Sequence, residues 1–208
     1  FSISTLQAQN SGEKMDTVSY AVGVWLGNIV KQQGFDKVDV EVVSKALNDV
    51  MSGGEVAIDP NQAGEILKNY INTKKEREAA ENAAAGQKFL EENAKKEGVT
   101  VLESGLQYEV MKEGTGPIPT AKDRVKVHYH GTLIDGQVFD SSVDRGQPAT
   151  FGVTQVIKGW VEALQLMPVG SKWRLVIPSE IAYGERGAGG MIGPGATLVF
   201  EVELLGIE

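Results

Sequence analysis

The spacing of the apolar residues changes near Gly98, and this change divides the chain into two parts that must fold differently. Before Gly98 the apolar pattern is that of helices, with apolar residues either on one stripe or around nearly the whole circumference. After Gly98 they alternate, which is typical of strands with one buried face: Leu106/Tyr108/Val110, Val125/Val127/Tyr129, Trp173/Leu175/Ile177 and Ala196/Leu198/Phe200/Val202/Leu204. A helical segment from Val156 to Leu166 interrupts these strands. We therefore expect an α+β domain over residues 98–208, in which an antiparallel twisted sheet wraps one short helix, preceded by an all-α part.

The first two predicted helices carry more apolar surface than they can bury by themselves. Apolar side chains cover nearly the whole circumference of the segment from Asp16 to Gln33, and such a helix must be buried on all sides. A second helix begins after Asp39 as its N-cap and ends at Gly53-Gly54. Roughly 40 residues rarely sustain a core without disulfides, metal or a partner chain. We therefore predict that residues 14–58 form a homodimerisation domain.

A long helix follows. Asp59 is its predicted N-cap and Pro60 its first residue, and no further proline occurs before Gly98. A helix from Pro60 to Glu97 would be about 57 Å long at 1.5 Å per residue. The stretch from Thr73 to Gln87 is mostly charged residues, Asn and Ala, with one glycine, Gly86. We interpret residues 59–97 as a linker helix whose middle is a solvated spacer with flexibility at Gly86.

The segment from Val125 to Ser142 brings one acid into apolar surroundings. Alternation along its first strand points Tyr129 inward and places His128 and His130 on the opposite face. Asp135-Gly136 predicts a tight turn, after which a second strand returns and delivers Asp140 close to Tyr129. A buried acid is costly unless it is bonded, so Asp140 is either a cap of the following turn or a site residue, and we favour the site.

Composition excludes several classes of function. The net charge is −8, from 28 acidic against 20 basic residues, which argues against nucleic acid as a partner. The chain has no cysteine, and this excludes disulfides, thiolate nucleophiles and thiolate zinc sites. The longest apolar window, Val18 to Val30, is interrupted by polar and glycine residues and is shorter than the roughly 20 residues of a membrane span. We therefore expect no membrane span.

The start of the chain favours export. Phe1 to Gln9 resembles the end of an apolar signal segment with a small-residue cleavage site at Gln7-Ala8-Gln9. Residues 1–13 are accordingly predicted to be a disordered or signal-derived tail. The expected location is periplasmic or otherwise exported, with a cytoplasmic location as the alternative.

Five blocks occur in order through the second half of the chain. They are V-H-Y-H-G around Tyr129, F-D-S-S at Phe139 to Ser142, V-I-K-G-W at Val156 to Trp160, A-Y-G at Ala182 to Gly184 and A-T-L-V-F-E-V-E-L-L at Ala196 to Leu205. From Ser104 to the C-terminus the chain resembles the FKBP-type peptidyl-prolyl cis-trans isomerases. The front half, with D-T-V-S-Y-A-V-G-V at Asp16 to Val24 and K-Q-Q-G at Lys31 to Gly34, resembles the dimeric bacterial Mip-like subgroup.

The resemblance implies an isomerase that rotates X-Pro bonds in unfolded or partly folded proteins, without a cofactor or a metal. It also implies a V-shaped dimer with chaperone activity and binding of macrolides of the FK506 and rapamycin type. By the same resemblance, the catalytic residues are Tyr129, Phe139, Asp140, Tyr183 and Phe200, and the substrate-binding residues are Arg145, Phe151, Val156, Ile157, Trp160 and Ile192.

The resemblance also suggests roles for individual groups. Trp160 would form the cavity floor under the proline ring, and the Tyr183 hydroxyl and the Ile157 N–H would hold substrate carbonyls. Asp140, steadied by Tyr129 and Arg145, would contact the carbonyl before proline. The chain departs from the family at Ala149, where many members have an aromatic residue, and in the loop from Ala188 to Ile192. These departures predict a looser cavity rim above an unchanged floor.

Three alternatives compete with this interpretation. His128 and His130 could form a metal site with Asp123 or Asp135, but spacing fixes no third ligand, so solvent-facing histidines are favoured. Ser141 and Ser142 lie near His130 in sequence, yet no strained nucleophile elbow accompanies them. The strongest alternative is a catalytically weak binding arm in a dimeric chaperone clamp. The retained acid and aromatic residues favour an active enzyme.

Overall fold

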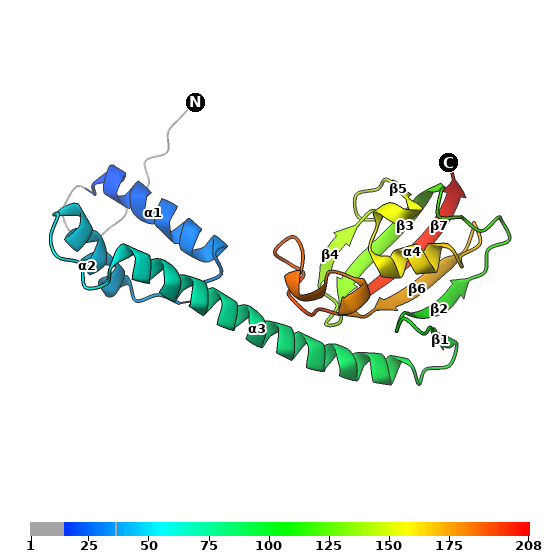
Figure 1. Ribbon diagram of the computed structural model, residues 1–208. Coiled ribbons are helices and arrows are strands. Elements are labelled where there is room, and N and C mark those ends of the chain that lie inside the picture. Colours follow the sequence, from blue (N-terminus) through cyan, green and yellow to red (C-terminus); the bar gives the residue numbers. More distant parts are fainter. Residues whose placement is uncertain (1–14, 36) are drawn as a thin grey trace, which may run out of the picture. The chain divides into compact units, whose positions relative to one another are not determined.

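The computed structural model describes residues 15–35 and 37–208, and the tail predicted over residues 1–13 lies outside the described residues. The chain forms two compact units that divide between Ile71 and Asn72. Figure 1 shows the helices of the first part and the sheet of the second. No helix among the described residues is both long and apolar enough to cross a membrane.

The first unit contains helices α1 (Thr17–Gln32) and α2 (Val40–Met51) and the beginning of α3 (Pro60–Asn93). Aspartates cap all three: Asp16 accepts a hydrogen bond from the amide of Val18, Asp39 from those of Glu41 and Val42, and Asp59 from that of Asn61. Neither α1 nor α2 has a buried residue within the single chain. Their large apolar side chains are exposed, including Trp25 at 63%. The apolar side chains of α1 and α2 that the sequence analysis expected to be buried are therefore exposed in the single chain.

The second unit is built on an antiparallel sheet of seven strands in the order β1-β2-β6-β7-β3-β4, with β5 paired to β3. The strands are β1 (Val99–Val101), β2 (Gln107–Lys112), β3 (Arg124–Leu133), β4 (Val138–Ser141), β5 (Ala149–Gly152), β6 (Lys172–Ile177) and β7 (Leu198–Ile207). Helix α4 (Lys158–Leu164) and three short 3₁₀ turns, η1 (Val153–Gln155), η2 (Ser179–Ile181) and η3 (Gly184–Arg186), complete the unit. The predicted α+β class, with helices preceding a sheet and one short helix, is confirmed.

The core lies between α4 and one face of the sheet (Figure 1). Trp160, Ala163 and Leu164 of α4 are buried in the same cluster as the inward-facing residues of β3, β6 and β7. Gly159 allows the close approach of the helix, because a Cβ there would lie 2.5 Å from Cγ2 of Ile177. This packing leaves the first turn of α4 at the edge of the cavity described below.

The second half of α3 packs against the sheet unit, so the interpretation of its middle as a solvated spacer is wrong. Gly86 is buried, and a Cβ there would lie 2.3 Å from Oγ1 of Thr197. Further along the helix, Nδ2 of the Asn93 side chain donates to Oε1 of Gln107 at 2.9 Å. Nη1 of Arg174 donates to Oδ1 of Asn93 at 3.0 Å. The contacting face consists of small and polar residues, and hydrophobic periodicity does not reveal such a face.

Candidate active site

A cavity of about 590 Å³ opens beside α4 in the sheet unit. It is lined by Tyr129, Phe139, Asp140, Phe151, Gln155, Val156, Ile157, Trp160, Tyr183, Ala188, Gly189, Met191, Ile192 and Phe200. The structure thus brings together in one place every candidate residue named from the sequence except Arg145. Arg145 lies just outside the lining and contacts two of its members.

Aromatic rings form the floor and walls of the cavity. The Trp160 ring meets those of Tyr129, Phe151 and Phe200 edge-on, with centroid separations of 5.5, 6.0 and 5.3 Å. Phe139 meets Phe200 in the same manner at 5.4 Å. Edge-to-face pairs at these distances are favourable beyond the area that they bury. The rings therefore hold one another in place around an apolar hollow.

A glycine in β3 makes room for two of these rings. A Cβ at Gly131 would lie 2.7 Å from Cε2 of Phe139 and 2.8 Å from Cε1 of Phe200. Gly131 is paired with Asp140 of β4 and with Phe200 of β7. The absence of a side chain at this central strand position lets both rings approach the sheet.

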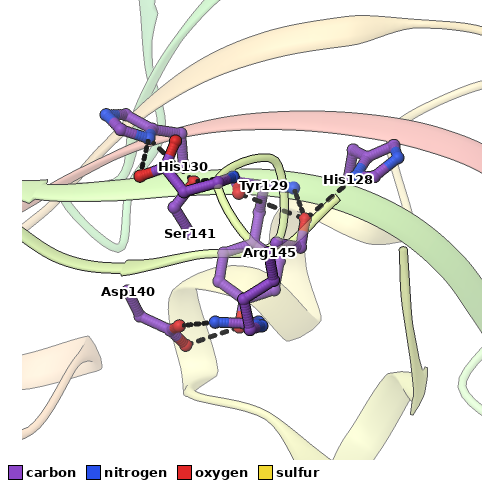
Figure 2. A network of polar contacts seen from close by, with 8 residues as sticks. His128, Tyr129, His130, Asp140, Ser141 and Arg145 are labelled. Carbon is purple, nitrogen blue, oxygen red and sulfur yellow. Dashed lines mark hydrogen bonds and ion pairs between the residues drawn. The ribbon is translucent and has the colours of Figure 1, made fainter. Parts of the chain in front are cut away.

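The polar part of the cavity is a cluster of Tyr129, Asp140 and Arg145 (Figure 2). The Tyr129 hydroxyl donates to Oδ2 of Asp140 at 2.5 Å and accepts from Nη2 of Arg145 at 2.9 Å. Nη1 of Arg145 forms an ion pair with Oδ1 of Asp140, and its guanidinium carbon lies 5.6 Å from the Tyr129 ring centroid. Each member thus bonds to the other two, and the carboxylate stays half-exposed at the cavity.

These contacts set the ionisation of the cluster. Burial raises the pKa of Asp140, but the hydrogen bonds from Tyr129 and Arg145 and the charge of Arg145 outweigh burial, so the pKa lies below its ordinary value. Burial raises the pKa of Tyr129, and the hydrogen bond to Asp140 adds to this. Burial also raises the pKa of Tyr183, as does the nearby charge of Asp140. At neutral pH the cavity therefore presents one carboxylate and two neutral phenols.

The turn after β4 is hydrogen-bonded to the backbone of Tyr129. The Ser142 hydroxyl accepts from the Tyr129 amide at 2.8 Å, and the Ser142 amide donates to the Tyr129 carbonyl at 2.9 Å. Nδ1 of His128 lies 3.1 Å from this hydroxyl, and Nδ1 of His130 lies 3.0 Å from that of Ser141 (Figure 2). Both serines and both histidines thus support the turn. Among the described residues no three acidic or histidine side chains are grouped as metal ligands.

Ile157 and Tyr183 are two residues of the cavity lining that carry hydrogen-bond donors. Ile157 precedes α4 as its N-cap residue, and no hydrogen bond from its amide is found within the described part of the chain. Tyr183 lies at the start of η3 and is 39% exposed, so its side chain borders the cavity and solvent.

Four lining residues were not among the candidates named from the sequence: Gln155, Ala188, Gly189 and Met191, although the loop from Ala188 to Ile192 was expected at the cavity rim. Gln155 directly precedes the V-I-K-G-W block, and this adjacency was an available signal. The other three belong to the loop before β7, where the sequence departs from the family pattern and offers no motif. Ile192, in the same loop, was named.

Comparison with known proteins matches both parts of the chain. A family described as FKBP-type peptidyl-prolyl cis-trans isomerase matches residues 116–205, and the domain amino-terminal to it matches residues 15–110. The chain is 50% identical over 192 residues to the FKBP-type 22 kDa peptidyl-prolyl cis-trans isomerase of Escherichia coli, covering 91% of this chain and 93% of that protein.

Two further relatives support the same match. The chain is 45% identical over 200 residues to the outer membrane protein MIP of Legionella longbeachae, covering 93% of this chain and 85% of that protein. The crystal structure of FkpA from Escherichia coli aligns with a TM-score of 0.75 at 37% identity, covering 95% of this chain and 99% of that one. The likeness therefore includes the helical front part as well as the sheet unit.

Proposed function

The chain belongs to the family of FKBP-type peptidyl-prolyl cis-trans isomerases, and we propose that the aromatic cavity is the place where it rotates X-Pro bonds. The observation that supports this most directly is the convergence of Tyr129, Phe139, Trp160 and Phe200 beside a single carboxylate, Asp140. Proteins that contain proline in unfolded or partly folded segments are the proposed substrates.

The proposed mechanism needs no covalent step. Rotation about a peptide bond faces a barrier of about 18–20 kcal/mol, and an unaided X-Pro bond takes tens of seconds to switch. The planar amide is more dipolar than the twisted transition state, because twisting interrupts its resonance. An apolar cavity that strips water from the amide therefore favours the twisted form. A millionfold acceleration would require about 8 kcal/mol of differential stabilisation.

The polar groups are proposed to hold the substrate while the bond turns. The Ile157 N–H and the Tyr183 hydroxyl would donate to substrate carbonyls, and the proline ring would lie on Trp160. Asp140, which Tyr129 and Arg145 hold in place, would contact the carbonyl before proline. Phe151, Val156 and Ile192 would complete the walls.

The test is a coupled isomerisation assay on a short peptide with a hydrophobic residue before proline. We expect Asp140→Asn and Phe139→Ala each to lower kcat/KM at least about tenfold, a loss of about 1.4 kcal/mol or more in transition-state stabilisation. Val138→Ala, at a more exposed position of β4 outside the lining, is the matched control. If the intact chain did not accelerate isomerisation, this function would be rejected. The catalytically weak binding arm of a chaperone clamp would then be the remaining interpretation.

Macrolides of the FK506 and rapamycin type are proposed to occupy the same cavity. A hollow of about 590 Å³ with mostly apolar walls and a few polar groups suits a ligand of drug size. Calorimetric titration should give one site per chain, and the bound macrolide should inhibit isomerisation competitively. Binding without competition would contradict the shared site.

We further propose that residues 14–58 form a homodimer, with residues 59–97 linking them to an isomerase domain over residues 98–208. The support is the apolar surface that α1 and α2 leave exposed in the single chain, including Val18, Trp25, Val42 and Val50. Light scattering should give twice the 22.3 kDa of one chain. A mass of one chain at micromolar concentration would reject the dimer.

Export to the periplasm is also proposed. Its support is the signal-like start of the sequence and the similarity to a protein named as an outer membrane protein. Fractionation of cells that express the protein from its natural gene should recover it in the periplasmic fraction. Recovery in the cytoplasm alone would favour the alternative location.

A further inference from the structure

The loop between η3 and β7 forms one wall of the cavity and has an unusual composition. It contributes Ala188, Gly189, Met191 and Ile192 to the lining. From Gly184 to Gly195, both included, the sequence contains six glycines, all of which lose much conformational freedom when the loop is ordered. Something other than the loop's own side chains must therefore hold this wall in place.

Backbone bonds close the loop on itself. The amides of Ala188 and Ile192 donate to each other's carbonyls at 2.8 and 3.0 Å, and the Gly195 amide donates to the Gly184 carbonyl at 2.9 Å. Gly187 adopts φ of +64°, and a Cβ there would lie 2.2 Å from the Ile192 carbonyl oxygen. These bonds shape the loop but do not fix its position on the domain.

Helix α3 lies against the base of the loop. A Cβ at Gly193 would lie 2.6 Å from Oε1 of Glu78 and 2.9 Å from Nδ2 of Asn82. A Cβ at Gly195 would lie 2.7 Å from the carbonyl oxygen of Ala79. Helix and loop thus meet closely at two glycines of the loop, and the residue before the first of them is Ile192 of the cavity wall.

Asn82 makes the polar contact across this junction. Its Nδ2 donates to the carbonyl oxygen of Pro194 at 2.8 Å, and the bond is partly buried. Asn82 lies four residues before Gly86, so both belong to the face of α3 that meets the segment from Gly193 to Thr197. Asn82, which bonds to the loop, therefore lies neither in the cavity lining nor in the sheet.

We propose that Asn82 is a positioning residue of the isomerase: it anchors the loop at Pro194 and so sets the position of the Met191 and Ile192 wall. This inference rests on the proposed function of the cavity. The Tyr129, Asp140 and Arg145 cluster belongs to other elements, namely β3, β4 and the turn after β4, and the hydrogen bonds that hold it together do not involve this loop. Loss of the anchor should therefore weaken substrate binding more than the rotation step.

The kinetic test uses the full chain with Asn82→Ala and Asn82→Asp. Asp keeps the shape of Asn but replaces the donor with a second acceptor facing the Pro194 carbonyl. Both variants should raise KM about three- to tenfold, as expected for one lost hydrogen bond, with kcat changed less than twofold. The increase should be larger for a peptide with Leu before proline than for one with Ala, since the displaced wall is apolar. Gln87→Ala, whose exposed side chain bonds to Glu91 on the same helix, is the control and should leave KM unchanged.

A second readout is independent of catalysis. Hydrogen exchange of the Ile192 amide, which is bonded to Ala188, should speed up about fivefold or more in both Asn82 variants. The Val202 amide in β7 should keep its protection in both. Unchanged exchange at Ile192, or an unchanged KM with an unchanged Leu-to-Ala ratio, would overturn the proposal. If the wild-type chain were inactive, the proposed function would fail, while the exchange experiment would still decide whether Asn82 anchors the loop.

Discussion

At the scale of single residues, Asp140 links the stability of the fold to pH. Its contacts with Tyr129 and Arg145 favour the charged carboxylate, so its pKa in the folded chain lies below the ordinary value of 3.8. For a depressed pKa, the stabilisation is fully present above the unfolded-state pKa and is lost as pH falls through the folded-state pKa.

The resulting prediction concerns the free energy of unfolding of wild type and Asp140→Asn. The wild-type advantage should be constant above about pH 5 and should shrink below about pH 4, as Asp140 becomes protonated. Urea unfolding at several pH values measures this difference. An advantage that grows on acidification would show that Asp140 is held in its neutral form.

Gly131 offers a second test at this scale. Gly131→Ala would push a methyl group into the Phe139 and Phe200 rings, which approach within 2.8 Å of the Cβ position. We expect kcat/KM to fall about tenfold or more, because displacing rings of the cavity by a fraction of an ångström misplaces the substrate. Gly206→Ala in β7 is the control, since a Cβ there meets nothing within 4 Å in the described chain. Equal activities of the two variants would contradict the role of Gly131.

At the scale of elements, Gly86 reverses the usual effect of a glycine in a helix. Replacing a helical glycine with alanine normally stabilises by about 0.5–1 kcal/mol. Gly86→Ala should instead destabilise by about 1–3 kcal/mol, because the added Cβ would lie 2.3 Å from Oγ1 of Thr197. Gly64→Ala in the same helix meets nothing within 4 Å and should stabilise. Chemical unfolding of the two variants measures the change in the free energy of unfolding, which should be a decrease for Gly86→Ala and an increase for Gly64→Ala.

A double-mutant cycle makes this prediction specific to the contact. Thr197→Ala removes the hydroxyl that clashes and leaves a Cβ at 3.1 Å, which can move by a few tenths of an ångström. The cost of Gly86→Ala should therefore be much smaller in the Thr197→Ala background. An equal cost in both backgrounds would mean that α3 does not approach Thr197 this closely.

The elements also show which parts of the fold a sequence can reveal. Caps at Asp16, Asp39 and Asp59 and the alternation through β3 and β7 are local signals, and the predicted elements lie where those signals are. Strands β1 and β5 were missed because three or four residues at a sheet edge carry too short an alternation. The packing of α3 was missed because its contact face is Ala79, Asn82 and Gly86, and small or polar contacts leave no hydrophobic period.

The cavity lining likewise has a part that the sequence predicts and a part that it does not. Its aromatic floor comes from strands and a helix whose residues form recognisable blocks, so those residues could be named in advance. Met191 and Gly189 line it through a loop whose position depends on contacts with α3, more than 100 residues earlier in the chain. The roles assigned to the named residues stay predictions until the Asp140 and Phe139 variants are assayed.

At the scale of the whole molecule, the exposed apolar surface of α1 and α2 is the largest feature that a single chain leaves unexplained. Trp25, Val18 and Val50 are each more than 60% exposed in the isolated chain. A dimer would bury them, and it would also tether two isomerase domains. Two tethered weak sites bind one client with an avidity that neither site has alone.

This interpretation predicts that dimerisation affects large clients and leaves small peptides unaffected. Trp25→Glu places a charge on the exposed apolar surface of α1, so we expect light scattering to give the mass of one chain. The kcat/KM for a short peptide should change less than twofold, because the cavity lies in the other unit. Suppression of aggregation of an unfolded, proline-containing client should fall severalfold. Gln32→Glu, an exposed polar position of the same helix, is the control for added charge. A monomeric variant that protects the client as well as wild type would show that the tether contributes nothing to chaperone activity.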